Sequence, residues 1–126
     1  MIVGYGVIFR FLADDCSALE RIITSKNIEY KLIKKDELVS LRSLKYAKEN
    51  TLITKMIEMG NIENLVNIIT EIISMIDLSD FEKIKHKDVW ISTLSNTDQY
   101  GFVLPNNLLE ILAKNRFSLV LSSEFV

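Results

Sequence analysis

Residues 2–32 read IVGYGVIFRFLADDCSALERIITSKNIEYKL, and this stretch decides the fold. Residues 2–12 are dominated by β-branched and aromatic side chains that alternate along the chain. Such a pattern is typical of a β-strand that is buried on one face. The apolar residues of one parity are Val3, Tyr5, Val7, Phe9 and Phe11. Arg10 lies on the opposite parity, so we expect it on the other face of the sheet.

An amphipathic helix is expected directly after this strand. Asp14, Asp15 and Ser17 can cap its start, and Ser17 with Glu20 fits a capping box. Asn27 suits the left-handed residue that ends a helix. Residues 28–32 alternate again and predict a second strand. The beginning of the chain is therefore a β-α-β unit.

The rest of the chain repeats this alternation of strands and helices. We expect a strand at 51–59, a helix at about 62–76, a charged connection at 77–87, a hairpin of strands 89–94 and 100–104, a helix from 105–107 onward, and a closing strand at 117–126. Residues 34–50 leave three readings open: a short helix, an irregular arm or an edge element.

This order of elements predicts an α+β fold. The specific expectation is a ferredoxin-like split β-α-β antiparallel sheet, with helices on one face and a C-terminal helix–strand extension. The chain has 126 residues and lacks a linker rich in Pro, Gly or Ser. We therefore expect a single domain over residues 1–126.

Composition narrows the classes of partner and the compartment. Lys and Arg number 15 and Asp and Glu 17, which gives a formal net charge of −2. This balance disfavours binding to nucleic acid, which requires many cationic contacts with phosphates. The single cysteine excludes an intramolecular disulfide framework and favours a cytoplasmic location. No apolar window approaches the ~18 residues of a membrane span, so no membrane partner is expected.

Catalytic motifs are absent from the sequence. It contains no P-loop, G-x-G-x-x-G, H-E-x-x-H or C-x-x-C pattern. The single histidine, His86, stands among lysines and is expected in an exposed loop. Cys16 is flanked by Asp14 and Asp15, which oppose thiolate formation, so a small buried residue is expected there. We therefore expect no enzyme activity, no cofactor and no metal site.

Two acidic clusters are the candidate binding residues. Asp14 and Asp15 could ligate a hard cation together with Glu20, but a calcium loop requires more oxygen ligands and a turn glycine, so helix capping is the simpler reading. The second cluster is Asp77, Asp80 and Glu82. It is either a solvated loop or a docking surface for a basic partner.

Aromatic residues on the first strand leave a further alternative. Tyr5, Phe9 and Phe11 could stack nucleic-acid bases, as on an RNA-binding sheet. The basic-Gly-aromatic signature that accompanies such a strand is absent from residues 51–59, TLITKMIEM. We therefore expect these aromatic side chains in the core.

A family resemblance covers nearly the whole chain, beginning with a first strand that ends in Ala13-Asp14-Asp15 before an amphipathic helix. Its other features are residues 89–92 (VWIS), residues 100–105 (YGFVLP), Leu108-Leu109, Leu112-Ala113 and residues 119–121 (LVL). This pattern resembles a large, functionally uncharacterised bacterial family of small α+β proteins. Such families often include immunity proteins encoded beside polymorphic or contact-dependent growth-inhibition toxins.

The resemblance implies an immunity protein that binds a cognate toxin, with a nuclease-type toxin domain as the expected partner. It would block the toxin's active site or a neighbouring surface. The expected partner-binding residues are the acidic ones: Asp14, Asp15, Asp77, Asp80 and Glu82. The alternative is a ligand-binding or regulatory ferredoxin-like domain, possible as a homodimer through residues 117–126. An enzyme based on carboxylates alone is the least favoured reading.

Overall fold

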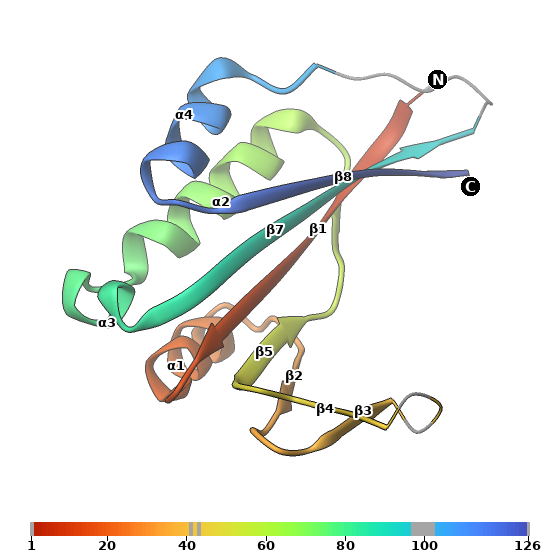
Figure 1. Ribbon diagram of the computed structural model, residues 1–126. Coiled ribbons are helices and arrows are strands. Elements are labelled where there is room, and N and C mark those ends of the chain that lie inside the picture. Colours follow the sequence, from red (N-terminus) through yellow and green to blue (C-terminus); the bar gives the residue numbers. More distant parts are fainter. Residues whose placement is uncertain (1, 41, 43, 97–102, 126) are drawn as a thin grey trace.

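The computed structural model describes residues 2–40, 42, 44–96 and 103–125 (Figure 1). The elements in chain order are β1 (Ile2–Ala13), α1 (Ser17–Ser25), β2 (Tyr30–Ile33), β3 (Leu38–Ser40), β4 (Lys45–Tyr46), β5 (Asn50–Thr54), β6 (Ile57–Met59), α2 (Ile62–Met75), α3 (Leu78–Glu82), β7 (Ile84–Ser95), α4 (Asn106–Lys114) and β8 (Ser118–Phe125). None of the described helices has the length and apolar character needed to cross a lipid bilayer.

Two long strands form the centre of the main sheet. β1 and β7 each have 12 residues and pair antiparallel along nearly their whole length. The strand order is β2-β5-β1-β7-β8, and β6 adds a second short partner to β1. β8 runs parallel to β7, because α4 carries the chain back to the start of β7. The fold is thus α+β, but the sheet is mixed and not the purely antiparallel sheet expected.

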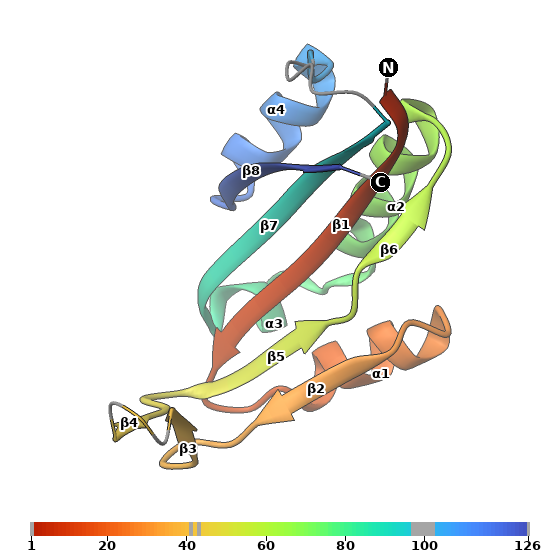
Figure 2. The same ribbon diagram turned by 90° about the vertical axis from the view of Figure 1, so that its right-hand side faces the viewer.

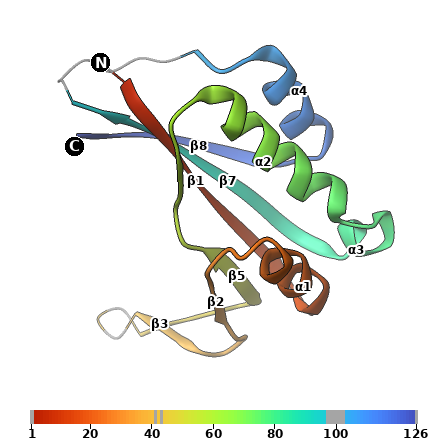
Figure 3. The same ribbon diagram turned by 180° about the vertical axis from the view of Figure 1, so that it is seen from behind.

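The core lies between this sheet and the helices α1, α2 and α4, which cover one of its faces (Figure 3). The inward side chains of β1 and β7 meet the apolar stripes of these helices. The most deeply buried residues of the layer are Val7, Phe9, Phe11, Ile23, Leu52, Leu65, Ile69, Ile72, Val89, Ile91 and Leu108. The expectation that these aromatic side chains belong to the core is confirmed for Phe9 and Phe11, and Tyr5 is half-buried against the same core.

The strand expected at 51–59 is two strands. β5 pairs with residues 10–13 of β1, and β6 pairs with residues 5–7. Between the two pairings the Phe9 amide donates to Thr54 Oγ1 at 3.0 Å. The chain bends at this point, and a side-chain oxygen accepts the hydrogen bond that the interrupted ladder leaves free.

The described residues of the segment 34–50 contain two short strands and no helix. β3 and β4 make a separate two-stranded sheet beyond β5 (Figure 2). Residues 77–87 are not only a connection, as was expected. They contain helix α3 and the first four residues of strand β7. Of the expected hairpin, residues 97–102 lie outside the described residues, and Val103 and Leu104 are not in a strand.

The helix boundaries follow the expected capping residues with one exception. Asn61 caps α2 by accepting a hydrogen bond from Asn64 N at 2.8 Å, and Asn27 adopts a φ of 57° after α1, as expected. The Ser17–Glu20 capping box does not form. Ser17 is instead the first helical residue, and Asp15 accepts hydrogen bonds from its amide and hydroxyl.

Candidate functional site

The turn between β1 and α1 carries the first two acidic candidates. Asp15 accepts a hydrogen bond from Ser17 N at 2.9 Å, and its contacts with Ser17 hold the pKa of its carboxyl below the usual value. Asp14 forms an ion pair with Lys85 of β7, with 3.0 Å between Oδ1 and Nζ. Hydrogen bonding to Lys85 is the main cause of its lowered pKa. Both carboxylates are exposed and charged at neutral pH, so they can meet a partner.

The other three acidic candidates lie on or beside α3. Asp77 precedes the helix and is exposed, and Asp80 is half-buried. Both line a shallow depression together with Arg21 of α1. Glu82 is exposed as well, but it borders a different pocket, described below. α3 therefore divides this cluster between two surfaces.

These carboxylates gather at one end of the molecule, where β1 ends and β7 begins (Figure 1). Arg21 links the two groups, because it interacts electrostatically with Asp15 and borders the depression at Asp77 and Asp80. Cations also lie among them: Arg21, Lys83 and Lys85. The surface is a mixed one with an acidic majority at the β1–α1 turn and at the start of α3. We call it the acidic end, defined by Asp14, Asp15, Asp77, Asp80 and Glu82.

A charged triplet that the sequence did not reveal lies on the sheet face opposite the helices. Asp88 is only 3% exposed and accepts a hydrogen bond from Arg10 Nε at 2.6 Å. His86 Nε2 lies 2.7 Å from the other carboxylate oxygen, Oδ1. His86 is exposed, as expected, but it lies in strand β7 and not in a loop, and it has this partner. Arg10 and Asp88 are direct cross-strand neighbours, which explains the pairing.

The same face carries an exposed aromatic residue. Trp90 pairs across the strands with Ile8 and Val120, and all three lie on the face that faces away from the helices. Its side chain is 38% exposed. No helix or strand of the described residues covers this face (Figure 2). We call it the open face, defined by Ile8, Arg10, Asp88, Trp90 and Val120.

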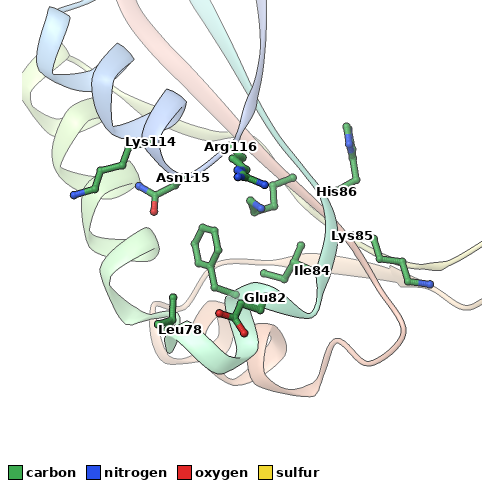
Figure 4. A pocket seen from close by; sticks show the side chains of 10 residues that line it. Leu78, Glu82, Ile84, Lys85, His86, Lys114, Asn115 and Arg116 are labelled. Atoms are coloured by element: carbon green, nitrogen blue, oxygen red, sulfur yellow. The ribbon is translucent and has the colours of Figure 1, made fainter.

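A pocket of about 600 Å³ opens beside α3. Its lining comes from α3, the start of β7 and the end of α4, and consists of Leu78, Phe81, Glu82, Ile84, Lys85, His86, Lys87, Lys114, Asn115 and Arg116. Four of these side chains are lysine or arginine and one is a carboxylate. Figure 4 shows Lys85 and His86 pointing away from the pocket, while Arg116 lies at its centre.

Lys87 is the unusual residue of this pocket. It is 8% exposed, and its Nζ lies 4.6 Å from the centre of the Phe81 ring and 5.8 Å from that of Phe117. Burial and the charge of Arg116 lower its pKa. The sequence gives a signal for this position, because Lys87 shares the parity of the inward residues Val89 and Ile91. Because residues 77–87 were expected to form a connection, the inward direction of the Lys87 side chain was not predicted.

Cys16 is buried beside the acidic end. Its Sγ lies 3.7 Å from the Asn50 carbonyl oxygen. Burial raises its pKa, and Glu20 and Asp15 act in the same direction. The thiol therefore stays protonated at neutral pH and is a poor nucleophile.

Comparisons with known proteins find no relative of this chain. No protein-family model matches the chain, and neither a curated protein nor a solved structure is significantly similar to it. Within the described part of the chain, no group of three or more His, Cys, Asp and Glu side chains is placed to hold a metal ion.

Proposed function

We propose that this protein is an immunity protein that binds and neutralises a cognate bacterial toxin, acting in the cytoplasm. The observation that carries the proposal is the acidic end. Residues that are more than 60 positions apart in the sequence, Asp14 and Asp15 on one side and Asp77 and Asp80 on the other, lie on neighbouring elements there. Asp14, Asp15 and Asp77 are exposed and Asp80 is half-buried, and together their carboxylates would form a docking surface for a basic partner.

A nuclease-type toxin domain fits this surface. A nuclease must bind phosphate groups, so its substrate cleft carries lysine and arginine side chains. Carboxylates opposite such a cleft speed association and favour one orientation of the complex. The immunity protein would then act by occlusion, because its acidic end would cover the cleft or a surface beside it.

The ferredoxin-like expectation is part of this proposal. Support comes from the order β2-β5-β1-β7, in which each strand is antiparallel to the next. α1 connects β1 to β2, and α2 precedes β7. On this interpretation α4 and β8 are the C-terminal helix–strand extension.

A growth assay tests the function. The protein encoded beside this chain would be expressed in a host cell alone and together with the chain. We expect growth arrest in the first case and growth in the second, together with a one-to-one complex in size-exclusion chromatography. A neighbouring protein that arrests growth and is neither bound nor neutralised by the chain would overturn the proposal.

Charge reversal tests the surface. Asp14→Lys and Asp77→Lys should slow association with the toxin and weaken protection against growth arrest. The effect on the association rate should become smaller as the salt concentration is raised. Glu110→Lys is the matched control, since Glu110 is exposed on α4, away from the acidic end. If reversal of each of the acidic residues left association unchanged, the toxin would bind elsewhere.

A ligand-binding domain is the second candidate, and one observation favours it. The pocket beside α3 is lined by several cations and is too open to be a packing defect. The homodimer form of this candidate would use the free edge of β8, which has β7 on one side only. The pocket is argued below as a site in its own right, separate from toxin binding.

A further inference from the structure

We propose that the pocket between α3, the start of β7 and the end of α4 binds a phosphate group. The site is built on Lys87 and Arg116, with Lys114 and Asn115 at its rim. This inference does not depend on the toxin-binding proposal, because Lys87 and Arg116 are not part of the acidic end.

Lys87 is a buried cation without an anionic partner. Its backbone lies in a β7 position whose neighbours on the same face, Val89 and Ile91, are fully buried. Among the described residues no carboxylate lies within ion-pair distance of its Nζ, which lies over the rings of Phe81 and Phe117. Burial of an unpaired charge is unfavourable. An anion in the pocket would remove that penalty.

Arg116 adds a second cation close enough to influence Lys87. Its charge opposes protonation of Lys87, so the two side chains repel each other unless an anion lies between them. Two cations held together on a rigid strand and a helix end are favourable for an anion of charge −2. The Arg116 guanidinium can also bind two oxygens of one phosphate group, which a lysine cannot do.

The backbone at Arg116 supports a use for this side chain. Arg116 follows α4 in the left-handed region, with a φ of 58°. Glycine is the favoured residue at this position after a helix, because a Cβ is strained there. The chain nevertheless has an arginine whose side chain lies in the pocket (Figure 4).

Phosphate fits the pocket better than a carboxylate does. A carboxylate has one negative charge and two oxygens, whereas phosphate at neutral pH has up to two charges and enough oxygens for Lys87, Arg116 and Asn115 together. The pocket volume of about 600 Å³ exceeds the need of phosphate alone. Phosphate could therefore enter as the free ion or as the end of a small phosphorylated molecule, and Phe81 lines the space beside it.

Isothermal titration calorimetry on the full chain tests the proposal with three probes at constant ionic strength. The probes are inorganic phosphate, glycerol 3-phosphate and acetate. We expect saturable binding of the phosphate probes and at least about tenfold weaker binding of acetate, the size of effect that one charge-assisted hydrogen bond gives. Tighter binding of glycerol 3-phosphate would identify a phosphate ester as the ligand, and tighter binding of inorganic phosphate the free ion. Absence of phosphate binding, or equal binding of acetate, would overturn the proposal.

Variants locate the site. Lys87→Met keeps the length of the buried stem, and Arg116→Gly relieves the strained backbone, so both chains should fold. Each should weaken phosphate binding at least about tenfold. Lys83→Met is the matched control, since Lys83 is an exposed lysine at the end of α3 that does not line the pocket. Unchanged binding in Lys87→Met would place any phosphate elsewhere.

Substitution of Glu82 should change phosphate affinity in the opposite direction. It is the one carboxylate among the described residues of the lining, and its charge competes with the ligand. Glu82→Gln should tighten phosphate binding, whereas weaker binding in this variant would contradict an anion site. Since Glu82 also belongs to the acidic end, the same variant should slow toxin association if the proposed function is correct. The two results separate the two proposals.

Discussion

Asp88 makes the protein sensitive to the loss of a single partner. It is 3% exposed, whereas the Arg10 side chain that pairs with it is 36% exposed. Arg10→Met would leave the carboxylate with His86 alone. We expect the free energy of unfolding to fall by about 1–3 kcal/mol, less than for a fully buried pair because water reaches Arg10. Urea denaturation at neutral pH measures this change.

The double variant Arg10→Met/Asp88→Leu is the control for that loss. It removes both charges from the open face, so no buried charge is left unpaired. Part of the stability lost in Arg10→Met should therefore return. A double variant that is less stable than Arg10→Met would show that Asp88 stabilises the fold without Arg10, through its contact with His86.

The Asp14–Lys85 pair predicts a local pH effect. Lys85 lowers the pKa of Asp14 and Asp14 helps to raise that of Lys85. Lys85→Met should therefore move the Asp14 pKa up toward its ordinary value, measured by NMR titration of the carboxyl carbon. Lys31→Met is the control, because Lys31 is exposed on β2 and makes no contact with Asp14. An unchanged Asp14 pKa in Lys85→Met would contradict the pairing.

The lowered pKa of Asp14 determines how the stability of the fold changes with pH. A carboxyl with a lowered pKa in the folded state contributes stability above its unfolded pKa and loses this contribution as the pH falls through the folded pKa. The wild-type protein should therefore lose slightly more stability than Lys85→Met upon acidification below the ordinary aspartate range. The effect is small, since both side chains are exposed and screened by solvent.

Single positions show what alternation along a strand can predict. The parity of residues 2–12 correctly predicted that Phe9 and Phe11 face the core and that Arg10 faces the other way. The partner of Arg10 could not be predicted, because Asp88 is 78 residues away in the chain. Lys87 was missed for a related reason. Its inward direction depends on β7 beginning at Ile84, and the charged residues there hid the strand.

Among the elements, the bend between β5 and β6 makes Thr54 important. Thr54 is 4% exposed, and its Oγ1 accepts a hydrogen bond from Phe9 N at 3.0 Å. Thr54→Val keeps the shape and leaves a buried amide without an acceptor. We expect destabilisation by about 1–3 kcal/mol. Hydrogen exchange at the Phe9 amide should also become faster.

Thr54→Ser is the matched control because it keeps the hydroxyl and removes only a methyl group. Its Phe9 amide should exchange as slowly as in the wild-type protein. If Thr54→Val and Thr54→Ser showed the same exchange rate at Phe9, the hydroxyl would not be the acceptor that joins the bend between β5 and β6 to β1.

Elements with a strong period and a cap were predictable, and those defined by distant partners were not. α2 begins at Ile62, as expected, because its isoleucines follow the helical period and Asn61 caps it. Residues 51–59 form two strands because they pair with two separate parts of β1. The local sequence pattern does not predict this division. The parallel direction of β8 has the same origin, because a closing strand of alternating residues fits either direction.

For the whole molecule, the two exposed surfaces predict different signals from Trp90, the single tryptophan of the chain. Trp90 is 38% exposed on the open face and lies four residues along β7 from His86, roughly 13 Å at 3.3 Å per residue. The acidic end lies beyond His86. A toxin that docks on the acidic end should therefore leave Trp90 exposed to water.

Fluorine NMR of the chain labelled with 5-fluorotryptophan measures this without interference from tryptophans of the partner. Upon saturation with toxin we expect the Trp90 resonance to broaden with the size of the complex but to keep its sensitivity to solvent isotope. Loss of that sensitivity would mean that the partner covers the open face. Loss of it with rising concentration of the chain alone would indicate a homodimer through the same face. A partner or second copy bound to the open face would exclude water from Trp90 and from the Arg10–Asp88 ion pair. The Trp90 resonance would report this binding.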